Sequence, residues 1–530
     1  MEKKNYNRFF HLHTVSGIVI SVGLYIIFFA GAFTLFLEAI SDWEKGSFLD
    51  QNNQEVLSTN KLDYDRLLNS LAQNDYDLYG RSISLNLKGK ETQNFTLSQS
   101  KDTISTKNAT KEYDLVVDTN TYKITKQKEV DYSSIGDLFY YLHFYYQLGR
   151  FGYYTSGFVA LFFLFAIVTG VVVHWKKIIS NFYVFRPLAK LKTVWTDAHT
   201  VLGMIGLPFQ FLYALTGAMF GLGILASLSS PLLYNGDTDK LDGVLYENHE
   251  VDLGTRTALN THIINPLLDS LATKWPDFTP KYITINNCAS TTMQFEVSGS
   301  ISPKINFFNN GAIIYDVSTK KEVYSNSPYT SNYNDAVNDT MYSLHYADYG
   351  NLGVWGNIGL RIIYFIMALI TCFVIITGVL IWLAARDKKN IPEKQRRFNE
   401  KVGHIYLAIS LTMLPITAFS FIVSKLIPHD FLEYRKVILY WVFFGGWLLL
   451  SIFFTLKKNN YFINKYTLLS GGILGLCIPL VNGLSSGNWI WRTFLNQNYT
   501  VFIIDTLWIG IAIISIYTVY RLKKTNKSLF

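Results

Sequence analysis

The chain has 530 residues, of which 49% are hydrophobic and 16% are aromatic, and it carries a formal net charge of +8. The apolar residues are concentrated in long runs almost free of charge, which indicates a membrane protein rather than a string of soluble domains. The basic residues lie in loops between these runs, as membrane topology requires, so the net charge does not indicate a nucleic-acid partner.

Eight apolar runs each approach the ~20 residues that a helix needs to cross a bilayer. They lie near 14–37, 154–174, 198–228, 354–384, 402–424, 437–455, 466–484 and 500–519. The first run is too long for the core of a secretory signal, and no small-residue cleavage site follows it, so we expect a retained helix. The sequence therefore predicts a mainly α membrane protein with about eight transmembrane helices.

Lysine and arginine residues in short loops predict the orientation of the helices. Basic residues gather between the second and third runs, between the fourth and fifth runs, and in the tail. They are Lys176, Lys177, Arg186, Lys190, Lys192, Arg386, Lys388, Lys389, Lys394, Arg396, Arg397, Lys401, Arg521, Lys523, Lys524 and Lys527. We expect these segments and both termini to be cytoplasmic.

Two long polar segments interrupt the apolar runs on the opposite side of the membrane. Each begins with helical spacing of apolar residues, from Asp63 and from Arg256, and then alternates as strands do. The expected strands cover 81–87, 112–118 and 122–130 in the first segment and 281–287, 293–299 and 312–318 in the second. We expect two small extracytoplasmic α+β domains built on one plan.

The chain therefore contains a repeat of span, outer domain and span. The expected parts are transmembrane helix 1 (1–40), the first periplasmic domain (41–135), helices 2 and 3 with their basic loop (136–229), the second periplasmic domain (230–345), helix 4 (346–386) and a four-helix extension (387–530). Three cysteines, Cys288, Cys372 and Cys477, lie far apart and imply no disulfide framework.

A motif of histidine and glycine occurs once in each half of the repeat. HTVSGIVISVGLYIIFFAG begins at His13 and HTVLGMIGLPFQFLYALTG begins at His199, and both read His-x3-Gly-x13-Gly. A second pair of histidines, His143 and His345, lies in similar Leu-His segments just outside the second and fourth runs. Each of those runs ends in Thr-Gly.

Ionisable side chains at membrane spans are costly unless they line a cavity or bind something. A single histidine at the interface can equally serve as an amphipathic anchor, as tyrosine and tryptophan do. Anchors need no correspondence between two halves of a chain, whereas a haem between two helices takes an axial imidazole from each. The pairs His13 with His199 and His143 with His345 therefore predict one haem near each face of the membrane.

The glycines of the motif have two interpretations. Gly17 and Gly203, one turn beyond the inner histidines, would let a flat macrocycle approach the backbone, or would serve ordinary close packing of helices. Gly31 and Gly217, further along their spans, have the same two interpretations. Gly31 lies about 27 Å along its helix from His13 and therefore belongs with the outer pair.

Four further residues also remain open. Arg150 and Arg361 lie beside the outer histidines, where they would bind haem propionates or lipid headgroups. His174 and His404 break the repeat and are alternative inner ligands or anchors. Zinc is the other metal option, but it needs three or four clustered ligands, and the chain has no H-x-x-x-H or C-x-x-C motif.

At these residues the chain resembles the PepSY-associated transmembrane family, which includes ferric-siderophore reductases and iron-regulated proteins of the bacterial inner membrane. The resemblance covers roughly 8–385 and is carried by HTVSG, LHFYYQLGRFG, IVTGVVVHW and AHTVLGMIGLPFQFLYALTG, with PepSY-like LVVDTNTYKITKQ and IIYDVSTKKEVY in the outer segments. It implies two b-type haems held by His13, His143, His199 and His345, with His174 as an alternative ligand, and electron delivery to a periplasmic ferric chelate.

Three functions are open at this point. The first is an inner-membrane haem protein that reduces a ferric siderophore with electrons from quinol or a cytoplasmic reductase, since the chain has no dinucleotide-binding fingerprint. The second is a non-redox scaffold or regulator that binds a periplasmic peptide, a peptidase or an outer-membrane partner. The third is a transporter whose spans break at Pro208, Pro415 and Pro479; we expect no acidic side chain inside the spans, which disfavours a proton-driven carrier.

Overall fold

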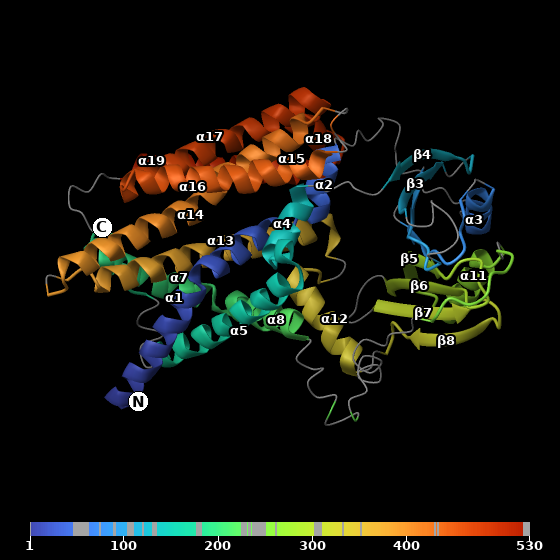
Figure 1. Cartoon of the computed structure of the whole chain (residues 1–530), viewed down its shortest axis with the longest axis horizontal. Coiled ribbons are helices and arrows are strands. Elements are labelled where there is room, and N and C mark those ends of the chain that lie inside the picture. Colours follow the sequence, from blue (N-terminus) through green and yellow to red (C-terminus); the bar gives the residue numbers. More distant parts are fainter. Residues whose placement is uncertain are drawn as a thin grey trace. The chain divides into compact units, whose positions relative to one another are not determined.

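The computed structural model describes most of the chain, which is mainly helical (Figure 1). The described residues are 2–45, 63–73, 76–87, 92–102, 111–118, 121–129, 135–175, 183–223, 231, 235, 251–259, 262–301, 310–330, 333–349, 352–388, 390–428, 431 and 434–522. Some of the predicted basic residues lie outside these ranges: Lys176, Lys177, Lys389 and the tail lysines. The chain divides into a helical unit (Met1–Gln54, Tyr132–Leu225 and Ile358–Phe530) and a sheet unit (Glu55–Asp131 and Ala226–Asn357).

The helical unit contains the membrane spans. Its first part holds α1 (Lys3–Thr34), α2 (Leu37–Lys45), α4 (Ile135–His143), η1 (Tyr146–Leu148), α5 (Gly149–His174), α7 (Leu191–Ile205), α8 (Leu207–Leu222) and α13 (Gly353–Ala385), which enters this unit at Ile358. Seven described helices are long and apolar enough to cross a membrane, and counting the bent pair of α7 and α8 as one span gives the expected eight. The prediction of a multi-pass membrane protein is confirmed.

The bend between α7 and α8 has a local cause. The two helices meet at 69° around Gly206, and Pro208 follows within the first turn of α8. A proline has no N–H for the preceding turn, and its ring clashes with the carbonyl four residues earlier. Pro415 and Pro479, by contrast, lie inside the continuous helices α14 and α17, so only one of the three expected breaks is present.

The four-helix extension forms a layer of its own in the helical unit. It comprises α14 (Glu393–Leu426), α15 (Arg435–Tyr440), the π-helical turn η5 (Trp441–Gly445), α16 (Gly446–Leu456), α17 (Asn460–Ser486), α18 (Ile490–Leu495) and α19 (Tyr499–Arg521). Figure 1 shows α14, α16, α17 and α19 in orange and red; α14 contacts α16 and α17, and α17 contacts α19. The extension packs on the rest of the unit at several places: α19 contacts α2, and α14 contacts α1, α4 and, in a shared buried cluster, α13.

The sheet unit is a single eight-stranded antiparallel sheet with the order β4-β3-β2-β1-β5-β6-β7-β8. The strands are β1 (Ile83–Asn86), β2 (Thr92–Leu97), β3 (Tyr113–Asp118), β4 (Ile124–Glu129), β5 (Phe278–Asn286), β6 (Gln294–Ile301), β7 (Asn310–Asp316) and β8 (Lys321–Asn326). The helices are α3 (Tyr64–Ala72), α11 (Ile264–Lys274) and α12 (Tyr333–Tyr346). All six predicted strands are present, and the sequence reasoning missed β2 and β8.

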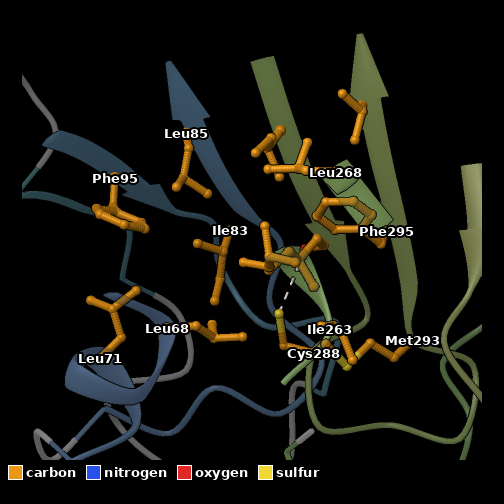
Figure 2. Packing of buried hydrophobic residues seen from close by; sticks show 14 of the residues in the cluster. Leu68, Leu71, Ile83, Leu85, Phe95, Ile263, Leu268, Cys288, Met293 and Phe295 are labelled. Carbon is orange, nitrogen blue, oxygen red and sulfur yellow. Dashed lines mark hydrogen bonds between the residues drawn. The ribbon is translucent and has the colours of Figure 1, made fainter. Parts of the chain in front are cut away.

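The two polar segments, expected as separate small domains, share this sheet because β1 pairs with β5. The pairing places Ile83 opposite Ile285 and Leu85 opposite Ile283. All four side chains are buried, so each half-sheet completes the core of the other (Figure 2). Outward from this central pair the strands follow in chain order on both sides, β1 to β4 on one side and β5 to β8 on the other. This is the arrangement expected for two copies of one plan.

The helices α3 and α11 stabilise each other's first turns. The Asp65 carboxylate of α3 accepts hydrogen bonds from the backbone N–H of Ile263 and of Ile264, at 3.0 and 2.7 Å. In return, the Asn265 side chain of α11 accepts from the N–H of Tyr64 at 3.2 Å. Each contact satisfies an N–H group that a helix start leaves unpaired.

Candidate functional site

His13 of α1 is fixed by a hydrogen bond to the second span. Its Nδ1 lies 2.8 Å from the backbone oxygen of Ala166 in α5. Gly170, one turn further along α5, lies beneath the imidazole: a Cβ atom added there would be 3.1 Å from the ring. The Nδ1 proton is therefore directed at a carbonyl, which leaves the Nε2 lone pair for another partner.

His199 of α7 has the same arrangement in the second half of the repeat. Its Nδ1 lies 2.9 Å from the backbone oxygen of Val374 in α13. Gly378 lies one turn further along α13, and a Cβ there would be 3.1 Å from the imidazole. The glycines of the two Thr-Gly pairs thus have one role in both halves, which is to let an imidazole rest on the neighbouring helix.

The structure brings the two inner histidines together. The ring centres of His13 and His199 are 6.3 Å apart, with 64° between the ring planes. An iron atom between two imidazoles, with metal–nitrogen bonds of about 2 Å, would separate the ring centres by roughly 6 Å. The spacing therefore fits a haem with two axial histidines.

The glycines one turn beyond these histidines leave space beside them. A Cβ on Gly17 would have no neighbour within 4 Å, and one on Gly203 would meet only Val374, at 3.9 Å. This openness agrees with the expectation that a flat ring approaches the backbone there. Gly217 is different, because a Cβ there would be 3.3 Å from Ala160, which is ordinary helix packing.

His143, at the end of α4, repeats the arrangement a third time. Its Nδ1 lies 2.8 Å from the backbone oxygen of Ile27 in α1, and a Cβ on Gly31 would be only 2.6 Å from the ring. Burial lowers the pKa of His143, which favours the neutral imidazole that binds iron. Gly31 thus lies with His143, as its distance from His13 predicted.

His345, the expected partner of His143, lies on α12 in the sheet unit. Its ring is edge-on to that of Tyr346, with centres 5.3 Å apart. The pairing of His143 with His345 therefore stays a prediction.

The two histidines that break the repeat differ from each other. His174, the last residue of α5, lies close enough to His13 and His199 for electrostatic interaction. His404 of α14 has its Nδ1 2.6 Å from Oδ1 of Asn460, and its Nε2 is 3.8 Å from Glu400. His174 therefore belongs to the inner histidine cluster, whereas the described contacts of His404 are polar ones within the extension.

The two arginines considered for propionates also differ. Arg150 is exposed at the first turn of α5. Arg361 of α13 is partly buried, and its Nε has no hydrogen-bond partner within the described part of the chain. An unpaired guanidinium N–H suits a carboxylate ligand, so Arg361 fits a propionate better than Arg150 does.

No group of three or more His, Cys, Asp or Glu side chains suited to a metal ion is found among the described residues. A haem with two axial histidines does not need such a group, because the porphyrin supplies the other four ligands.

A buried charged cluster in the helical unit was missed by the sequence reasoning. Glu44 of α2 forms an ion pair with Arg435 of α15, and both side chains are buried. The other carboxylate oxygen of Glu44 accepts a hydrogen bond from the N–H of Ile135, the first residue of α4, at 2.9 Å. Burial raises the pKa of the Glu44 carboxyl, against the opposing effect of Arg435. Glu44 therefore links the extension to the helix that ends at His143.

Asp505 belongs to the same region and corrects one expectation. It lies inside α19, fully buried, and its carboxylate accepts hydrogen bonds from Trp43 at 2.8 Å and Asn482 at 2.9 Å. Lys425 of α14 lies over the Trp43 ring, 4.8 Å from its centre. The expectation that the spans contain no acidic residue is wrong at this position, and a single carboxylate within the apolar run 500–519 was the signal that would have found it.

Comparison with known proteins assigns the chain to a family. Residues 10–385 match the family described as the PepSY-associated TM region. The chain belongs to this PepSY-associated transmembrane family. The match runs from α1 to α13 and includes His13, His143 and His199. It ends before the four-helix extension, as the resemblance predicted.

The PepSY-associated chain is also similar to a curated protein of Pseudomonas aeruginosa, "Uncharacterized protein PA4219". The two are 22% identical over 222 residues, which are 40% of this chain and 54% of the relative. The similarity thus spans about half the length of that relative.

Proposed function

We propose that this PepSY-associated membrane protein holds two haem b groups and passes electrons across a bacterial inner membrane to reduce a periplasmic ferric chelate, such as a ferric siderophore. The observation that carries the proposal is the pair of inner imidazoles, 6.3 Å apart, each with its Nδ1 directed at a backbone carbonyl. Haem, when bound, would supply one-electron transfer between the two faces of the membrane.

The chain's own residues would position the two groups. His13 and His199 would be the inner ligands, and the carbonyls of Ala166 and Val374 would fix their tautomers and make the Nε2 atoms more basic. His174 would contact the inner group or replace one ligand.

The outer group would use His143, held by Ile27, and His345. The Arg361 guanidinium would pair with a propionate, with Arg150 as the more exposed alternative.

The proposed setting has the basic loops and both termini in the cytoplasm and the sheet unit in the periplasm. The electron donor would be a quinol or a separate cytoplasmic reductase. The helical unit would be embedded in the lipid bilayer.

An experiment can test the proposed activity directly. The full chain would be purified in detergent with its bound cofactor, and its visible spectrum recorded before and after dithionite. It would then be placed in liposomes that contain a reductant, with a ferric chelate outside. We expect a haem b spectrum and ferrous iron outside the vesicles; a colourless protein that forms no ferrous iron would contradict the proposal.

A non-redox scaffold or regulator is the second candidate function, and one observation favours it. Among the described strands, the sheet order leaves β4 and β8 at the edges, and an edge strand can pair with an extended peptide. The partner would then be a periplasmic peptide, a peptidase or an outer-membrane protein. A colourless protein that binds such a partner would favour this function over the first.

A further inference from the structure

Six polar side chains form one stripe along α14. They are Asn399, Tyr406, Ser410, Thr417, Ser420 and Ser424, and their spacing of three, four or seven residues places them on a single helix face. All six are buried, with at most 6% of each side chain exposed. The stripe covers about 37 Å of helix at ~1.5 Å per residue, more than the ~30 Å hydrocarbon core of a bilayer.

Five of these side chains have a polar atom without a hydrogen-bond partner within the described part of the chain. The atoms are Asn399 Nδ2, Tyr406 OH, Ser410 Oγ, Thr417 Oγ1 and Ser420 Oγ. The Tyr406 and Ser410 hydroxyls are close to each other, but neither forms a bond of normal geometry. A serine or threonine in a membrane helix ordinarily donates to the carbonyl one turn earlier, so these hydroxyls are exceptional.

Thr412, on another face of the same helix, shows the ordinary behaviour. Its hydroxyl is 2.6 Å from the carbonyl oxygen of Ala408 and 3.0 Å from the Ser451 hydroxyl of α16. It is also fully buried. Burial in α14 therefore does not by itself leave hydroxyls without partners, and the unpaired groups belong to the stripe.

The stripe lies where the extension meets the first part of the helical unit. A Cβ on Gly403, beside the stripe, would be 3.2 Å from Leu383 of α13. Tyr406 lies in one buried cluster with Leu380 and Leu383 of α13, and Ile18 of α1 packs against this cluster. The stripe therefore follows the seam between α14 and the helices that carry the repeated histidine motif.

The far end of the stripe meets the buried charged cluster. The Ser424 hydroxyl donates to the Phe421 carbonyl at 2.9 Å and lies near the Glu44 carboxylate, which is paired with Arg435. Lys425 is the next residue along α14 and lies over the Trp43 ring, whose N–H donates to Asp505. The stripe thus ends beside a carboxylate of the cluster.

An unpaired buried polar group destabilises a fold, because the hydrogen bonds it made to water are not replaced. Buried water commonly removes this cost, because one molecule makes about three hydrogen bonds to such groups. Water molecules that bridge successive hydroxyls form a chain along which a proton can be passed.

We propose that the polar stripe of α14 binds a file of water molecules that conducts protons along the seam between Asn399 and Glu44. A proton would enter from water at the Asn399 end, pass between hydroxyls and bound waters, and leave to water at the Glu44 end, with no net change in the protein. The proposal does not depend on haem. In a protein that also moves electrons from the Asn399 side to the Glu44 side, each proton would offset the charge of one electron.

Proton flux through the full-length protein tests this proposal. Purified chain would be placed in liposomes that enclose a pH-sensitive dye, and a potassium gradient with valinomycin would impose a membrane potential. We expect the wild type to take up protons at least tenfold faster than protein-free liposomes. The variant Ser410→Ala/Thr417→Val/Ser420→Ala should fall to the protein-free rate, and the single variant Thr417→Val, which keeps the side-chain volume, should be clearly slower than the wild type.

The matched control is Thr412→Val, which removes a buried hydroxyl of the same helix outside the stripe. It should conduct as fast as the wild type. Wild-type flux no faster than that of empty liposomes would overturn the proposal, and so would an unchanged rate in Thr417→Val. If the triple variant fails to elute as a single species of wild-type size, the comparison of Thr417→Val with Thr412→Val decides.

Discussion

The Nδ1 atoms of His13, His143 and His199 each bind a backbone carbonyl. In all three cases a glycine lies four residues after the residue that supplies the carbonyl. The three pairs are Ala166 with Gly170, Ile27 with Gly31 and Val374 with Gly378. The glycine lets the ring lie on the helix backbone, and the carbonyl fixes the tautomer. A histidine that served only as an interfacial anchor would need neither feature.

Gly170→Ala tests the role of these glycines. The new methyl would lie 3.1 Å from the His13 ring, so the imidazole must move although the helix itself gains about 1 kcal/mol. We expect the variant to remain folded and to lose at least half of its inner haem, as measured from the absorbance of the reduced protein. Gly510→Ala is the matched control, because a Cβ there meets nothing within 4 Å; equal haem loss in both variants would speak against the assigned role.

Cys288 provides a test at the residue scale in the sheet unit. Burial raises the pKa of this thiol to about 12, so the reactive thiolate is rare at pH 8 while the unit is folded. We expect an alkylating reagent to modify Cys288 only in denaturant, as followed by mass spectrometry of the intact chain. The neutral thiol is favoured in the fold, so its contribution to stability is present below the unfolded pKa and is lost as the pH rises toward 12. Rapid modification of the native protein at pH 8 would contradict the buried position.

At the scale of elements, Glu44 joins the extension to α4, because its carboxylate pairs with Arg435 and accepts from the N–H of Ile135. Removing one partner of a buried pair leaves an uncompensated charge and costs about 3–5 kcal/mol. We therefore expect Glu44→Gln to lower the unfolding temperature of the helical unit in detergent, and the double variant Glu44→Gln/Arg435→Met to recover part of the loss. Equal losses in both variants would show that the pair does not couple these helices.

Much of the element order could be predicted from the sequence, because apolar runs and alternating strands are local patterns. The eight spans and six of the eight strands were found in this way. The pairing of β1 with β5 could not be predicted from local patterns, because it joins residues about 200 positions apart in the sequence. The same limit applies to the site: the repeat pointed to the histidines, but the carbonyls that fix them lie on other helices.

At the scale of the whole molecule, the expected topology follows from an even number of spans. The bent pair of α7 and α8 must cross as one span for both termini to face the same side. We expect a reporter that fluoresces only in the cytoplasm to be active when fused after Phe530 and inactive when inserted in the sheet unit between Asp118 and Thr121. Activity at both positions would contradict the eight-span arrangement.

The histidine pair at the inner end is the central claim, and the haem content of single-histidine variants tests it most directly. Haem would be measured per chain in the wild type, in His13→Ala, in His199→Ala and in His11→Ala, which removes an exposed histidine two residues from the proposed ligand. The account predicts two haems in the wild type and in His11→Ala, and one in each of the other two variants. Two haems in all four proteins, or none in the wild type, would contradict it.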